Sequence, residues 1–194
     1  MVEIARGRIP DLTAAVDDAA NVDQHFRGEV FDLICTHFIT GFVPLSHLAP
    51  RVFQKLKPGG YLTLLGATGE AFPVLRRKAS GKILQLVFRG RKPDLANLIT
   101  PANAGEVADQ LLRNGFEIIR LELLEPELRF ANFDDFMEFA YHGGWLTPFI
   151  EDIGLHQARP ALRKLLNSFV FPVRDQHRIV SALVRRPVDS EFDG

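Results

Sequence analysis

The stretch from Phe31 to Gly66 constrains the fold more than any other part of the chain. It begins with a nearly unbroken apolar run, residues 31–36. A run that is apolar on both faces is typical of a parallel strand that helices cover on each side, since a half-exposed strand would alternate apolar and polar residues. A helix is expected after Pro44, because apolar residues recur at helical spacing at Leu45, Leu48, Val52, Phe53 and Leu56.

The segment Lys57-Pro58-Gly59-Gly60 should end this helix. Glycine accepts the left-handed turn that closes a helix, and proline cannot continue one. Residues 61–66 are then the next strand. The whole stretch therefore predicts a strand–helix–strand unit with a parallel sheet, which is the mark of an α/β fold.

Length and composition limit the possible classes of protein. The chain has 194 residues, which predicts one domain with a sizeable core. Its formal net charge of −1 predicts no general affinity for nucleic acid or for a membrane surface. No apolar run reaches the roughly 18 residues that a membrane span needs. Cys35 is the only cysteine, which excludes a disulfide within the chain and fits a reducing cytoplasm, so we expect a cytoplasmic protein.

Several chemistries have no motif in this sequence. It lacks HExxH, CxxC, a phosphate-loop lysine and a serine nucleophile elbow, so the metallohydrolase, nucleoside triphosphatase and esterase classes are unsupported. The six histidines are scattered without metal-ligand spacing. The sequence therefore predicts no metal site.

Four segments together resemble the class I S-adenosylmethionine-dependent methyltransferases. In chain order they are FDLICTHFI, the helix end LKPGG, the strand YLTLLGA and the helix-to-strand step LLRNGFEIIRLEL. The resemblance implies a Rossmann-like fold, in which a mostly parallel sheet has an antiparallel final strand. It also implies S-adenosyl-L-methionine as cofactor and a small molecule as methyl acceptor.

The same resemblance implies that the amino-terminal part of the domain is missing. Residues 1–8 resemble a phrase that lies well inside the family's domain. The first two strands and the glycine-rich turn would then be absent. In the family the first strand pairs with the strand that corresponds to residues 31–39, so we expect this strand to have an unpaired apolar edge. Such an edge favours a homo-oligomer or aggregation.

A short strand is expected at residues 12–16, before an acidic and small pair that the resemblance assigns to the cofactor. Asp18 would accept a hydrogen bond from the adenine amino group, and the small Ala19 would let the ring lie close. The alternative is that Asp17 and Asp18 cap the helix that follows.

Thr36, His37 and Phe38 follow the first apolar strand, where open parallel sheets bind ligands. The resemblance places Thr36 near the methionine part of the cofactor and Phe38 near the acceptor. His37 would face the reacting centre and act as a base if the acceptor must lose a proton. The alternative is a structural hydrogen bond, the commoner role of a single histidine at a strand end.

Residues 69–92 form the most basic stretch, and a helix should begin near Pro73 with a break at Ser80-Gly81. This stretch is either a site for an anionic partner or a solvated helix face. A second helix should begin at Thr100-Pro101 and end at Gly115.

Two strands are expected in the second half of the chain, residues 116–123 near a sheet edge and the antiparallel residues 178–184. These strands complete a partial methyltransferase domain of residues 1–124 and 171–187. A flexible tail, residues 188–194, follows it.

A helical insertion of residues 125–170 lies between these strands, and Asn132 and Pro160 mark the starts of two of its helices. The resemblance suggests that the insertion covers the substrate site and brings the side chains of Tyr141, His142 and Trp145 to the acceptor. The alternative is that these aromatic residues are core.

Two functions remain open. The first is methyl transfer to a small-molecule acceptor. The second is a non-catalytic binding or assembly protein on the same scaffold, which the missing glycine-rich turn favours.

Overall fold

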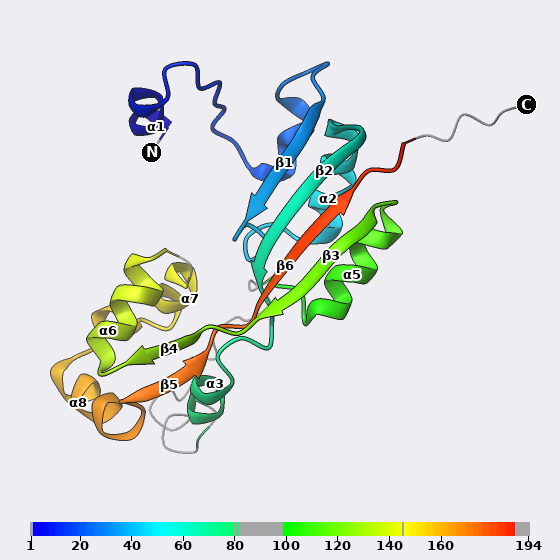
Figure 1. Cartoon of the computed structure of the whole chain (residues 1–194). Helices are drawn as coiled ribbons and strands as arrows, with labels where there is room; N and C mark the ends of the chain where they lie inside the picture. The colour runs from blue at the N-terminus through cyan, green and yellow to red at the C-terminus, as the bar shows by residue number, and fades with distance from the viewer. Residues whose placement is uncertain (1, 80, 82–98, 145, 189–194) are drawn as a thin grey trace, which may run out of the picture.

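The computed structural model of the chain describes residues 2–79, 81, 99–144 and 146–188. Its main sheet has four strands in the order β1-β2-β6-β3 (Figure 1). Their bounds are Phe31–His37 for β1, Leu56–Ala67 for β2, Ile179–Arg185 for β6 and Glu117–Leu124 for β3. β1 and β2 pair in parallel, whereas β6 is antiparallel to both of its neighbours. Strands β1, β2 and β3 therefore share one direction, which confirms the expected α/β sheet with an antiparallel strand.

Helices α2 (Leu45–Lys55) and α5 (Ala104–Arg113) lie on the same face of this sheet (Figure 1). Alternate residues of β2 and β6 point into the space between sheet and helices, because side chains alternate along a strand. The first core consists of these residues and the apolar faces of the two helices, and it includes Leu48, Ala49, Val52, Leu62, Leu64, Val107, Leu111, Val180 and Val184.

The prediction that helices cover β1 on both faces is wrong for the residues that the structure describes. Leu33, which points away from α2, is 55% exposed, and Cys35 and His37 on the same face are also exposed. The reason is that α2 and α5 both pack on the opposite face. Within the described residues β1 pairs with β2 alone, so its outer edge is unpaired, as expected.

Residues 12–16 do not form the predicted strand. No neighbouring strand of the described structure offers them backbone partners, and the carbonyl oxygen of Ala14 accepts instead from the Arg6 side chain at 3.0 Å. Helix α1 (Val2–Arg8), before this segment, buries no side chain. The short 3-10 helix η1 (Ala19–Gln24) follows it and contacts α2.

The helix α2 ends at Lys55, but β2 begins at once with Leu56 and includes the segment that we expected to be a turn. Leu56 pairs with Phe31 across the ladder, and the register shifts before Leu33. Gly60 fits because a Cβ there would meet three backbone carbonyl oxygens within 3.2 Å. Gly60 therefore allows close strand contact, and the prediction that this segment ends the helix is wrong, because α2 ends before it.

The start of α5 was also predicted three residues too early. Asn103 is the residue that caps it, since its side chain accepts from the backbone N–H of Glu106 at 3.0 Å. The Glu106 carboxylate accepts in turn from the N–H of Ala102, so two amide groups are satisfied at once. Gly115, with φ of 85°, ends the helix as predicted.

The second unit of the chain, which we call the helical unit, stands on a two-stranded ribbon. Strands β4 (Glu127–Phe130) and β5 (Val173–Gln176) pair antiparallel and continue from β3 and β6 away from the main sheet (Figure 1). Neither four-residue strand was predicted, because so short a segment has no clear period. The unit contains α6 (Phe133–Met137), the π-helix η3 (Glu138–His142), α7 (Thr147–Asp152), the 3-10 helix η4 (Leu155–Gln157) and α8 (Pro160–Phe169).

The caps of this unit agree with the sequence. Asn132 accepts from the backbone N–H groups of Asp134 and Asp135, and α8 begins at Pro160. The helices bury a second core, separate in sequence from the first, which includes Phe130, Phe133, Met137, Ile150, Leu166, Val170, Phe171 and Val173. Phe130, Phe133 and Phe171 belong to this core, whereas Tyr141 is half-buried and His142 is exposed, so the prediction that these two residues are core is not confirmed.

Helix α3 (Pro73–Ala79) begins where predicted. The buried carboxylate of Asp175 accepts from the backbone N–H groups of Val74 and Leu75, which fastens α3 to β5. Ser80 and the second half of the basic stretch, residues 82–92, lie outside the described residues. Among the helices that are described, none has the length and apolar character to cross a membrane.

Candidate functional site

Thr36 and His37 lie at the carboxyl end of β1, and both contact Thr63 of β2. The buried Thr36 hydroxyl donates to the Thr63 carbonyl oxygen at 3.3 Å. The exposed His37 ring has its Nε2 atom 3.2 Å from the Thr63 hydroxyl. His37 therefore has the structural hydrogen bond that we considered as an alternative, while its ring still reaches solvent. An exposed imidazole with one oriented nitrogen can accept a proton from a bound molecule.

Phe38 turns the chain out of β1 in an unusual backbone conformation. Its φ is 56°, its N–H donates to the Leu65 carbonyl oxygen at 2.7 Å, and its side chain is 48% exposed. Phe72, beyond the carboxyl end of β2, has φ of 57°. Positive φ in a bulky residue costs about 1–3 kcal/mol and persists only where the surroundings enforce it, often at functional sites.

Both phenylalanines contact one histidine, His177. The ring centroid of His177 lies 6.3 Å from that of Phe38 in a stacked pair and 4.8 Å from that of Phe72. The Phe139 ring of the helical unit approaches it edge-on at 6.2 Å. Burial lowers the pKa of His177 from its ordinary value of 6.5, so the ring is neutral at neutral pH. His177 is thus the aromatic junction between the end of the sheet and the helical unit.

Sequence analysis missed His177, although a signal was present. The residue directly precedes the segment predicted as the antiparallel strand. The amino end of an antiparallel strand lies beside the carboxyl ends of its parallel neighbours. A histidine at that position should therefore meet the residues that follow β1 and β2.

Buried hydroxyl groups lie at the same end of the sheet. Thr40 and Thr68 are both almost completely buried. Within the described part of the chain the Thr68 hydroxyl has no hydrogen-bond partner. A Cβ on Gly66 would collide with the Thr40 hydroxyl, so only glycine fits there. Unsatisfied buried polar groups are uncommon in proteins.

Asp18 and Ala19, the predicted adenine contacts, lie beside α2. The Asp18 carboxylate accepts from the Ala20 N–H at 2.8 Å and caps η1, and Ala19 packs against the first core. Asp17 bonds His25 Nε2 at 2.7 Å, and chiefly this hydrogen bond lowers the pKa of Asp17. The capping role is therefore present in the structure. Contact of Asp18 and Ala19 with adenine stays a prediction.

Tyr141 and His142 lie within the helical unit. The Tyr141 hydroxyl donates to Glu151 at 3.0 Å, which raises the pKa of the phenol, and its ring stacks on His156 at 5.7 Å. His142 adjoins Tyr141 at a ring distance of 5.2 Å. Trp145 lies outside the described residues. Tyr141 thus contacts Glu151 and His156, whereas the ring contacts that reach the end of β1 run through His177.

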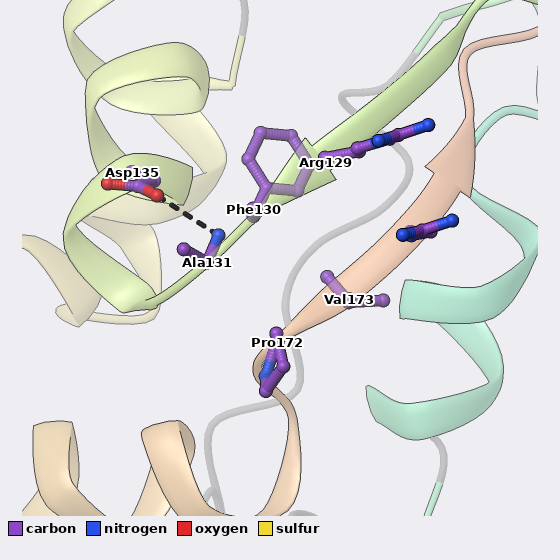
Figure 2. A pocket seen from close by; sticks show the side chains of 7 residues that line it. Arg129, Phe130, Ala131, Asp135, Pro172 and Val173 are labelled. Carbon is purple, nitrogen blue, oxygen red and sulfur yellow. Dashed lines mark hydrogen bonds between the residues drawn. The ribbon is translucent and has the colours of Figure 1, made fainter.

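An open hollow of about 370 Å³ lies at the outer end of the ribbon (Figure 2). Its lining comprises Arg129, Phe130, Ala131, Asp135, Pro172, Val173 and Arg174. Figure 2 shows Asp135 turned toward Ala131, whose N–H it accepts at 3.0 Å. None of the predicted site residues lines this hollow. The Arg129 guanidinium pairs with Glu127, and the Asp135 carboxylate is bonded to the backbone. We assign no function to the hollow.

Among the described residues no three histidine, cysteine, aspartate or glutamate side chains gather as metal ligands would. The site that the geometry supports is the end of the sheet, where the residues after β1 and β2 meet His177. It comprises Thr36, His37, Phe38, Thr68 and His177.

Solved structures share this arrangement of strands and helices. A candidate methyltransferase of Bacillus halodurans C-125 superposes with a TM-score of 0.56 at 15% identity, over 96% of this chain and 79% of the other. The YcgJ protein of Bacillus subtilis gives a TM-score of 0.57 at 16% identity, over 96% of this chain and 76% of the other. The fold is that of the class I methyltransferases.

No protein-family model matches the chain, and no curated protein matches its sequence. At 15–16% identity the likeness establishes the methyltransferase fold alone.

Proposed function

We propose that this chain catalyses methyl transfer from S-adenosyl-L-methionine to a small-molecule acceptor. One observation carries the proposal: in a methyltransferase-fold sheet, Thr36, His37 and Phe38 lie together at the carboxyl end of β1. Ligands of open parallel sheets bind outside this end. The unsatisfied Thr68 hydroxyl near β2 adds a polar group that a ligand could satisfy.

The cofactor supplies a methyl group on a positively charged sulfur, and transfer is a displacement that depends mainly on alignment. The acceptor's lone pair forms the new bond to carbon while the carbon–sulfur bond breaks, which leaves S-adenosylhomocysteine. In this proposal Thr36 orients the methionine part, and Asp18 and Ala19 hold the adenine. The exposed Phe38 ring lines the acceptor side, with Tyr141, His142 and Trp145 as further acceptor contacts. His37 takes the acceptor's proton where one must leave.

Calorimetric titration of S-adenosylhomocysteine into the 194-residue chain tests cofactor binding. We expect a dissociation constant in the micromolar range, about −8 kcal/mol. Absence of heat from a sample shown to be folded would contradict the proposal for this chain.

Two variants separate the roles of the proposed residues. Asp18→Ala should weaken binding of S-adenosylhomocysteine, and the exposed Asp11→Ala, seven residues earlier, serves as the control. His37→Gln should retain that binding and lose turnover. Unchanged turnover in His37→Gln would remove the proposed base.

A non-catalytic assembly role is the second candidate, and one observation favours it. The face of β1 that bears the exposed Leu33 is uncovered, and the outer edge of the strand has no partner in the described structure. A folded chain that binds a protein through this edge and gives no heat with S-adenosylhomocysteine would support this role over catalysis.

A further inference from the structure

The opposite edge of the sheet, strand β3, is also uncovered. β3 pairs with β6 only, among the described strands, and Figure 1 shows it as the outermost strand in front of α5. Large apolar side chains are exposed along this edge and on the adjoining helix: Leu112 (54%), Ile119 (47%), Leu123 (42%) and Leu124 (41%). Contiguous exposed apolar surface commonly marks an interaction site.

The ladder shows which backbone groups of β3 point outward. Thr68 N–H donates to the Arg178 carbonyl, and Arg186 N–H donates to the Gly60 carbonyl, so even-numbered residues of β6 face β2. Odd-numbered residues of β6 consequently face β3, where Leu183 opposes Arg120 and Ser181 opposes Glu122. The N–H and C=O groups of Leu121 and Leu123 therefore point away from the sheet.

We propose that a second copy of this chain covers the edge, with β3 antiparallel to β3 and Leu121 opposite Leu121 about a two-fold axis. This register places Ile118 opposite Leu124 and Ile119 opposite Leu123. It also places Arg120 opposite Glu122. The residues with outward backbone groups then oppose each other, as an antiparallel ladder requires.

The sequence of β3 is self-complementary in this register and in no adjacent one. A shift by two residues opposes either Arg120 to Arg120 or Glu122 to Glu122, and like charges directly opposite are destabilising. A shift by one residue puts the side chains on the wrong face. Within one copy Arg120 and Glu122 already lie 2.6 Å apart, so the dimer joins two such pairs into a network of four charges.

Strand β3 contains neither proline nor lysine, two residues that commonly block strand addition. The irregularity in its pairing lies between Ile118 and Arg120, and residues 120–124 continue in regular register with β6. The centre of the proposed interface therefore lies on a regular segment of the strand.

Sedimentation equilibrium of the full chain at micromolar concentrations tests the proposal. We expect a reversible dimer. Leu123→Lys, at an exposed position, should weaken it about tenfold or more, since it adds a charge next to an apolar partner. The matched control is Leu33→Lys on the opposite edge, which should leave the dimer intact.

A charge exchange tests the register itself. Arg120→Glu and Glu122→Arg should each weaken the dimer, since each opposes like charges, and the double variant should restore it. Circular dichroism checks that every variant is folded. A chain that is monomeric at all these concentrations overturns the proposal. So does a double variant no better than the single ones, and a dimer that Leu33→Lys dissociates would place the interface on β1 instead.

Discussion

At Phe38, with φ of 56°, the backbone favours glycine over any residue with a side chain. Phe38→Gly and Phe38→Ala both remove the ring, so their difference reports the backbone alone. We expect the glycine variant to have the higher free energy of unfolding, by about 1 kcal/mol, as measured by urea denaturation.

The same pair of substitutions at Leu112, exposed in α5, should give the opposite order, since alanine stabilises a helix by about 1 kcal/mol relative to glycine. If alanine is also the better residue at position 38, the backbone there is not strained.

His177 should make stability depend on pH. Burial lowers its folded-state pKa below the ordinary 6.5, so the unfolded chain binds a proton more readily. The free energy of unfolding is therefore at its full value above pH 6.5. It decreases as the pH falls from there through the lower folded-state pKa of His177. His177→Phe should remove this loss. The melting temperatures of both proteins above and below pH 6.5 measure this effect. An equal dependence of melting temperature on pH in the two proteins would contradict the prediction.

Among the elements, α3 depends on a residue almost a hundred positions away. Asp175 accepts from Val74 N–H at 3.0 Å and from Leu75 N–H at 2.6 Å, and it is buried. Asp175→Asn turns one acceptor into a donor that faces another donor. We expect a loss of about 1–3 kcal/mol in the free energy of unfolding by chemical denaturation.

Asp135→Asn is the matched control, because Asp135 is exposed and accepts from the N–H of Ala131 at 3.0 Å. It should cost clearly less than Asp175→Asn. An equal loss in the two variants would mean that burial and the second bond contribute nothing.

Elements with strong local signals could be predicted from the sequence. The nearly unbroken apolar run of β1, the cap at Asn132, the helix start at Pro160 and the left-handed Gly115 all lie where their chemistry indicated. The strand at residues 12–16 failed because a strand needs a neighbour, and local preference cannot supply one. β4 and β5 were missed because four residues show no period.

The candidate site was only partly predictable for a similar reason. Thr36, His37 and Phe38 follow from strand order, since the carboxyl end of a strand can be read locally. His177 is joined to Phe38 through a pairing of distant segments, which one sequence does not reveal. The grouping of Tyr141 with Glu151 and His156 depends likewise on how α7 folds back on η3.

At the scale of the whole molecule, two cores are linked by one ribbon. Phe133 is fully buried in the second core, and Phe133→Ala should cost about 3–5 kcal/mol there. Hydrogen exchange should then accelerate in residues 127–176 and stay slow in β2 and α2. Leu64→Ala, in the first core, should show the reverse pattern. Equal acceleration in both parts would show that the chain unfolds as one cooperative unit.

The chain leaves the main sheet after Leu124 and returns at Ile179, and these two residues oppose each other in the ladder. Everything between them is therefore attached through the β4–β5 ribbon and through α3, which Asp175 holds. A relative could exchange the whole of residues 125–178 for a hairpin or for another helical cover, and the ladder would still close. In a lineage of such proteins, residues 125–178 could therefore change in size and composition while the four-stranded sheet stays the same.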